Sequence, residues 1–136
     1  MPETQTIPKP APTSPYERLG GLPVLERITG RFYDLMDSDP AYAELRAMHA
    51  PDLGHMRGAL AHFLAGWSGG PRDWFEANPG RCMMSIHKDY TIGADTAGQW
   101  ADAMHRAIQE ELGETDPQIA SEMSRVLQQL CMGMVR

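Results

Sequence analysis

The sequence of 136 residues predicts an all-α fold in one domain. Apolar residues recur at helical spacing along four segments, which lie within residues 22–36, 52–67, 96–112 and 117–134. No segment alternates apolar and polar residues over the length of a strand. The connectors between the four segments differ widely, so we expect helices that cross one another rather than a regular up-and-down bundle.

The first two long helices are placed by their boundary residues and apolar stripes. Pro23 suits the first turn of a helix, which ends just before Pro40 because the residue preceding a proline avoids the helical region. One or two helical turns over residues 41–48 follow. Asp52 can cap the next helix or favour its first turn, and Ser68-Gly69-Gly70-Pro71 stops it. The predicted buried faces are Leu25, Ile28, Phe32, Leu35 and Met36, then Leu53, Met56, Leu60, Phe63, Leu64 and Trp67.

The second half of the chain contains the other two long helices. The connector over residues 72–80 is predicted to be irregular, with Trp74 and Phe75 anchoring it to the core. Asp95 or Thr96 can cap the third long helix. Asp116-Pro117 opens the last one, because Asp is a good N-cap and Pro suits the first helical position.

Composition narrows the class of protein. Hydrophobic residues make up 42% of the chain, and the formal net charge is −6. An acidic balance without runs of Lys or Arg argues against nucleic acid or an anionic membrane as a partner. No apolar run approaches the roughly 18 residues of a membrane span, and the N-terminus has no signal-peptide core. We therefore expect a cytoplasmic protein, as a monomer or a weak homodimer.

The cysteines and the N-terminus add two further expectations. Cys82 and Cys131 form no CxxC or CxxCH motif, which excludes the usual zinc spacing and covalent c-type haem attachment. We expect two buried thiols. Residues 1–15 hold five prolines and little that is apolar, so they are predicted to form a disordered extension before a domain over residues 16–136.

His87 is a candidate metal ligand within the short apolar stretch over residues 81–93. Imidazole is the commonest protein ligand to metals, and a single histidine holds the iron in many haem proteins. A lone histidine beside Met and Ile is nevertheless more often a core or surface residue. The stretch by itself leaves both interpretations open.

Several motifs follow one another along the chain with characteristic spacing. They are Tyr16 with Leu19-Gly20-Gly21, Phe32-Tyr33, Phe63-Leu64 leading into Gly69-Gly70-Pro71, His87 with Tyr90-Thr91-Ile92, and Trp100 with Met104-His105-Arg106-Ala107. Each motif is weak alone. Together, from Tyr16 to about Met134, they make the chain resemble the truncated haemoglobins, the two-over-two helical globins, and most of all their group II.

The resemblance implies a globin-like two-over-two sandwich of helices around haem b. His87 matches the proximal histidine, whose imidazole binds iron. Tyr33 and Trp100 match the distal tyrosine and the group II tryptophan, which donate hydrogen bonds to the bound ligand. His49 matches a variable polar or aromatic position at the edge of the distal pocket, and Met56 matches the distal histidine position.

Other haem contacts are implied on both sides of the ring. Leu60 and Phe63 would line the distal side. Group II members usually carry arginines before the proximal histidine, and these meet the haem propionates, but the positions here read Met84, Ser85 and Ile86. The candidates for contacts at the haem edge are therefore Met84, Lys88, Tyr90 and Arg81.

The function that the resemblance implies is reversible binding of dioxygen and other small diatomic ligands. Dioxygen on ferrous iron takes up negative charge, and each charge-assisted hydrogen bond donated to it is worth roughly 1.5–3 kcal/mol. One alternative is a peroxidase-like or nitric oxide dioxygenase-like enzyme that uses the same haem with an external reductase. Another is an interaction module that has kept the fold and lost the haem.

Overall fold

The computed structural model describes residues 14–81, 87 and 92–135, and these residues form helices and connecting turns without a strand. The helices are α1 (Pro15–Leu19), α2 (Leu22–Ser38), the 3-10 helix η1 (Pro40–Tyr42), α3 (Ala43–Ala47), α4 (Gly54–Trp67), α5 (Asp73–Ala77), α7 (Ala94–Leu112) and α8 (Pro117–Met132). The all-α prediction is confirmed. Of the predicted N-terminal extension, only the last two residues are described: Ser14 caps α1 and Pro15 opens it.

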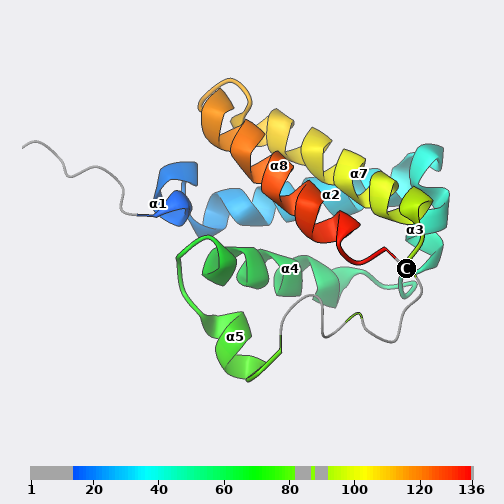
Figure 1. Cartoon of the computed structure of the whole chain (residues 1–136), viewed down its shortest axis with the longest axis horizontal. Helices are drawn as coiled ribbons and strands as arrows, with labels where there is room; N and C mark the ends of the chain where they lie inside the picture. The colour runs from blue at the N-terminus through cyan, green and yellow to red at the C-terminus, as the bar shows by residue number, and fades with distance from the viewer. Residues whose placement is uncertain (1–13, 82–86, 88–91, 136) are drawn as a thin grey trace, which may run out of the picture.

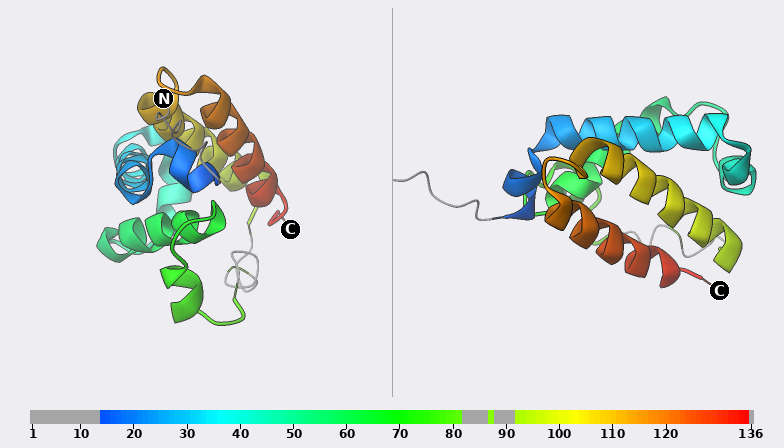
Figure 2. Two further views of the ribbon diagram at one scale, coloured as in Figure 1. Left: turned by 90° about the vertical axis from the view of Figure 1, so that its left-hand side faces the viewer. Right: turned by 90° about the horizontal axis from the view of Figure 1, so that it is seen from above.

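Two pairs of helices make up the body of the molecule. α7 and α8 lie antiparallel against each other, and α4 packs along α2 (Figure 1). α2 also packs against α7, which it crosses obliquely, as the view from above shows (Figure 2). This is the predicted two-over-two arrangement. α2 is central to it, because this helix packs against both α4 and α7.

The boundary between α2 and η1 follows from the predicted proline signal. Asp39, the residue before Pro40, has extended backbone angles, with φ −99° and ψ 118°. Its N–H still donates to the carbonyl of Leu35 at 2.9 Å, which closes α2. Its carboxylate accepts from the N–H of Ala41 at 2.9 Å, which opens η1. One residue therefore ends one helix and begins the next.

Two helix starts differ from the prediction by one to three residues. α4 begins at Gly54, and Asp52 lies just outside it, accepting from the Gly54 N–H at 2.8 Å. α7 begins at Ala94 after Gly93, so neither Asp95 nor Thr96 is its N-cap. The Thr96 hydroxyl instead donates to the Gly93 carbonyl at 3.1 Å. Asp116 caps α8 as predicted.

The prediction of an irregular connector over residues 72–80 is wrong, because α5 occupies its centre. Trp74 and Phe75 do anchor it, with ring centroids 5.1 and 5.5 Å from that of Phe63 on α4. Gly66 permits this packing, since a Cβ there would lie 2.7 Å from the Phe75 ring. A helix of five residues is too short to show a helical period in the sequence.

The core contains the predicted apolar stripes. Leu25, Ile28 and Phe32 of α2 are completely buried, as are Ala107 and Ile108 of α7. Cys131 is also buried, and burial raises the pKa of its thiol to about 11, whereas Cys82 lies outside the described residues. Among the residues described, no helix is long and apolar enough to cross a bilayer.

Candidate functional site

Tyr33 of α2 is a buried tyrosine whose hydroxyl has no hydrogen-bond partner among the described residues. The residue is 2% exposed. Its hydroxyl makes no hydrogen bond in the part of the chain that the structure describes. Burial raises the pKa of Tyr33 to about 12, against a smaller opposing effect of the Arg57 charge. The group therefore stays an O–H donor at neutral pH.

Trp100 of α7 supplies a second donor beside the first. Its side chain is half-buried and packs against the core. The completely buried ring of Phe32 lies edge-on to both aromatic neighbours, with its centroid 4.8 Å from that of Tyr33 and 5.3 Å from that of Trp100. Within the described residues the indole N–H has no hydrogen-bond partner. Phe32 thus fixes the spacing of two unpartnered donors from two crossing helices.

His49, just after α3, adds a third polar side chain. Its Nδ1 lies 2.9 Å from the carbonyl oxygen of Leu45. Since a carbonyl only accepts, Nδ1 carries the proton in the neutral ring, and Nε2 is left as an acceptor. The imidazole lies edge-on to Tyr33, with 6.2 Å between the ring centroids. The structure therefore places His49 beside Tyr33, and Phe32 beside both Tyr33 and Trp100.

The predicted apolar residues lie on α4. Leu60 and Phe63 are 8% and 4% exposed, and Met56 is half-buried against the core. Met56 and Leu60 are four residues apart, so they share one face of the helix. Leu60 and Phe63 belong to the same apolar core as Tyr33, Met56 packs against that core, and α5 packs against Phe63.

The proximal side is described only in part. His87 is half-buried in a turn between α5 and α7 and has an interaction partner of its own. Three predicted haem contacts, Met84, Lys88 and Tyr90, lie outside the described residues, and Arg81 is exposed. The role of His87 as an iron ligand therefore stays a prediction.

The donor set fits haem better than a bare metal ion. No group of three or more His, Cys, Asp or Glu side chains among the described residues could hold a metal. A porphyrin brings four nitrogen ligands of its own, so one protein imidazole is enough. Unpartnered donors beside apolar side chains also suit a flat apolar group that carries a small polar ligand.

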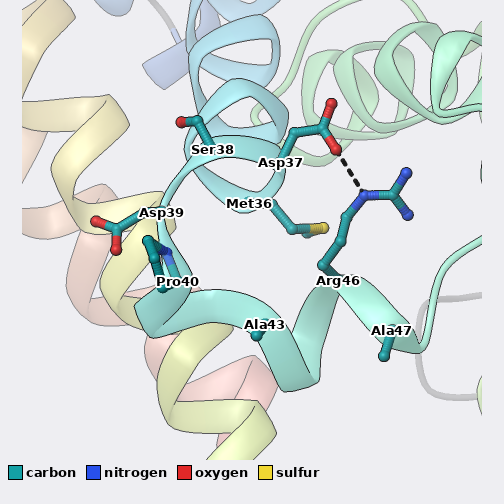
Figure 3. A pocket seen from close by; sticks show the side chains of 8 residues that line it. All are labelled: Met36, Asp37, Ser38, Asp39, Pro40, Ala43, Arg46 and Ala47. Atoms are coloured by element: carbon teal, nitrogen blue, oxygen red, sulfur yellow. Dashed lines mark hydrogen bonds and ion pairs between the residues drawn. The ribbon is translucent and has the colours of Figure 1, made fainter.

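Two shallow hollows on the surface are separate from this cluster. The first, of about 350 Å³, lies between the end of α2 and α3 (Figure 3). Asp37 and Arg46 face each other across it and form an ion pair at 2.8 Å, while Asp39 points away from it. The second, of about 540 Å³, is shared by Asp37 and the start of α4. Neither contains Tyr33, His49 or Trp100.

Polar groups that hold the cluster in place were missed by the sequence analysis. Gln99 of α7 accepts from the N–H of Leu45 at 3.1 Å. Arg57 of α4 donates to the carbonyl of Gly30 at 3.0 Å and to the carboxylate of Asp34 at 2.8 Å, which ties α4 to α2. These contacts join residues 23 to 54 positions apart, and no local pattern in the sequence signals them.

Comparison with known proteins gives a consistent result. Residues 14–134 match the family model described as bacterial-like globin. The structure is similar to the cold-adapted truncated haemoglobin of the Antarctic marine bacterium Pseudoalteromonas haloplanktis TAC125, with a TM-score of 0.86, 30% identity, and coverage of 91% of this chain and 98% of that one. No curated protein sequence matches the chain significantly.

Two further solved structures share the architecture. The group II 2-on-2 haemoglobin of Agrobacterium tumefaciens has a TM-score of 0.87 and 26% identity, over 95% of this chain and 98% of that one. A thermostable haemoglobin of the actinobacterium Thermobifida fusca has a TM-score of 0.79 and 26% identity, over 91% and 98%.

Proposed function

The chain belongs to the bacterial-like globin family and has the fold of the group II truncated haemoglobins, and from this premise we propose that it binds haem b through His87 and holds dioxygen reversibly. Other small diatomic molecules, such as carbon monoxide and nitric oxide, would bind at the same place. Haem-binding is what the family implies; the identity of the haem, its ligand residues and the bound gas are the proposal.

The observation that carries the proposal is the pair of unpartnered donors, Tyr33 and Trp100. The Tyr33 hydroxyl has no hydrogen-bond partner among the described residues, so it can donate to a molecule from outside the protein. The two donors come from α2 and α7, both side chains lie beside the ring of Phe32, and we infer that they serve one small acceptor. A diatomic ligand that gains negative charge on binding is such an acceptor.

The residues around these donors have distinct parts in the proposal. Haem would supply a ferrous iron with one open position for a gas molecule. Tyr33 keeps its proton because burial raises its pKa to about 12, so it donates throughout the physiological range. Met56 has no strong donor, which leaves the stabilisation to Tyr33 and Trp100, with His49 at the edge. Leu60 and Phe32 keep water away from the donors.

The haem ligand is tested by His87→Gly. The purified parent protein, reconstituted with haem b, is expected to show a Soret band that titrates to one haem per chain. His87→Gly removes the proposed iron ligand, so the band should be lost or much weakened, and free imidazole should restore it. The measurement is an absorption titration of the ferric, ferrous and carbonmonoxy forms.

His55→Gly is the matched control, because His55 is exposed at the start of α4. It should bind haem as the parent does. Full binding by His87→Gly, with an unchanged spectrum, would contradict the assignment of the iron ligand. A parent protein that takes up no haem would contradict the proposed function as a whole.

A further inference from the structure

We propose that Gln99 is a positioning residue of the ligand pocket, which holds the first turn of α3 and thereby orients His49 beside Tyr33. The inference rests on the proposed function, because the effect it assigns to Gln99 is on ligand dissociation. Gln99 directly precedes Trp100 on α7, and α3 lies against that end of α7 (Figure 1).

The side chain of Gln99 forms hydrogen bonds to two consecutive residues of α3. Its Oε1 accepts from the N–H of Leu45 at 3.1 Å, and its Nε2 donates to the carboxylate of Glu44 at 2.9 Å. A backbone N–H only donates and a carboxylate only accepts, so the two partners fix the orientation of the amide. Both bonds link α7 to α3 across more than fifty positions of the sequence.

We expect α3 to depend on these two hydrogen bonds for its position, because the helix is short. The N–H of Leu45 lies in the first turn, where backbone donors have no partner within the helix. The N-cap residue Tyr42 commits its hydroxyl to Asp102 rather than to α3. A helix of five residues has little stability of its own. Gln99 therefore caps α3 from a neighbouring helix.

The second half of the link runs from Leu45 to His49. The carbonyl of Leu45 accepts from Nδ1 of His49 at 2.9 Å and from the N–H of Met48 at 3.1 Å. Leu45 is 5% exposed, so it has little room to move independently of the core. The N–H of Leu45 donates to Gln99, and the carbonyl of Leu45 accepts from His49. A shift of α3 away from Gln99 would thus move the imidazole relative to Tyr33.

In this arrangement α7 positions two of the three polar side chains of the proposed pocket. Trp100 comes from α7 directly, and His49 is tied to α7 through Gln99 and Leu45. Tyr33 comes from α2, with its ring 6.2 Å from that of His49. Hydrogen-bond energies fall steeply with distance and angle, so an imidazole displaced against the Tyr33 ring would change how well the Tyr33 hydroxyl donates to a ligand.

Variants of the haem-loaded protein separate this role from general damage. Gln99→Met keeps the length of the side chain and removes the amide. Gln99→Glu combined with Glu44→Gln exchanges the two ends and can remake both hydrogen bonds. Gln128→Met, at an exposed position of α8, is the matched control. His49→Ala, alone and with Gln99→Met, tests whether the effect passes through the imidazole.

Two measurements are made on each variant. NMR of the carbonmonoxy form reports the hydrogen exchange of the Leu45 N–H and the nitrogen shifts of the His49 imidazole. Stopped-flow measurement reports the dissociation rate of dioxygen. Gln99→Met is expected to speed hydrogen exchange at the Leu45 N–H, to shift the His49 signals and to change the dissociation rate of dioxygen. The exchange rate and the dissociation rate should each change by about two- to tenfold, which is the effect of losing one neutral hydrogen bond.

The exchanged pair should restore both rates, and Gln99→Met should have no further effect on dissociation in the His49→Ala background. Unchanged His49 signals in Gln99→Met, or an equal change of rate without His49, would overturn the inference. Failure of the proposed function looks different: the parent itself would bind no haem, or Tyr33→Phe would not alter dissociation. In that case the exchange at Leu45 and the His49 signals are recorded on the parent and variant proteins as purified.

Discussion

Tyr33 and Tyr42 are two equally buried tyrosines whose hydroxyl groups differ completely. Each residue is 2% exposed, and burial is the main cause that raises the pKa of each. The hydroxyl of Tyr42 donates to Asp102 at 2.5 Å and accepts from Arg106 at 3.0 Å. The hydroxyl of Tyr33 has no partner among the described residues. Burial alone therefore does not separate the two tyrosines, but hydrogen bonding does.

The surroundings of Tyr42 are those of a structural network. Arg106 also donates to Asp39 at 2.9 Å, so one guanidinium joins η1 and the end of α2 to α7. The N–H of Ala41 and then this guanidinium hold the pKa of Asp39 below its usual value. Polar networks in which every member is paired rigidify a fold. Among the described residues, Tyr33 belongs to no such network.

The largest expected contrast is seen at alkaline pH. The pKa of Tyr33 is about 12 in the folded protein, against 10.0 ordinarily. Because the folded value is the raised one, the contribution of the neutral phenol to stability is complete below about pH 10 and is lost as the pH rises through about 12. The shift corresponds to about 3 kcal/mol.

Urea unfolding at several pH values between about 9 and 12.5 measures this contribution as the difference between the parent protein and Tyr33→Phe. The parent should lose more stability than the variant over this range. The other tyrosines titrate in both proteins and cancel in the difference. Parallel stability curves for the two proteins would show that burial does not hold the Tyr33 proton.

Substitution of Tyr33 by Phe should change function more than stability. If its hydroxyl donates to a ligand with negative charge, Tyr33→Phe should speed dioxygen dissociation by about ten- to a hundredfold. The free energy of unfolding at neutral pH should stay nearly the same, because no protein group loses a hydrogen bond. Stopped-flow dissociation measures the first quantity and urea unfolding the second. An unchanged dissociation rate would reject the donor role.

Tyr42→Phe should show the opposite behaviour. Asp102 and Arg106 would each lose a partner, and the expected cost is about 1–2 kcal/mol in the free energy of unfolding, since both groups retain access to water. The dissociation rate of dioxygen should stay within about twofold of the parent rate. The same two measurements apply. A variant that dissociates ligand quickly at full stability would reverse the roles assigned to the two tyrosines.

Much of the fold could be predicted because its long helices carry apolar stripes over several turns. Pro40 and Asp116 also mark boundaries by local rules that hold in the structure. α5 was missed, because one helical turn has no measurable period. The start of α7 was predicted too late, because Thr96 is of a residue type that often caps helices. In the structure its hydroxyl donates to the Gly93 carbonyl and does not cap the helix.

The candidate site was less accessible to local rules. Tyr33, His49 and Trp100 were identified by resemblance to a family, because nothing in their immediate sequence distinguishes a donor in a pocket from a core aromatic. In the structure Phe32 lies beside Tyr33 and Trp100, but in the sequence it could be recognised only as a core residue. Gln99 could not be found at all, since its partner Leu45 is 54 positions away and both residue types are ordinary in helices.

The smallest expected effect is that of Arg31→Gln. This variant tests whether an ion pair between α2 and α7 stabilises the fold as much as the hydrogen-bond network of Tyr42 does. Arg31 donates to Glu110 at 2.8 Å, and the two side chains are 40% and 46% exposed. Such an exposed ion pair contributes at most about 0.5 kcal/mol, and salt screens it. Arg106 is similarly exposed, at 41%, but it is bonded to a buried hydroxyl as well as to Asp39.

Urea unfolding of Arg31→Gln and Arg106→Gln at low and at high salt compares the two links. Arg106→Gln should be clearly less stable than the parent at both salt concentrations, because Tyr42 stays buried after it loses a donor. Arg31→Gln should differ little from the parent, and the small difference should vanish at high salt. Equal losses of unfolding free energy in the two variants would mean that exposed ion pairs stabilise the packing of α2 on α7 as much as the hydrogen bonds of buried Tyr42 do.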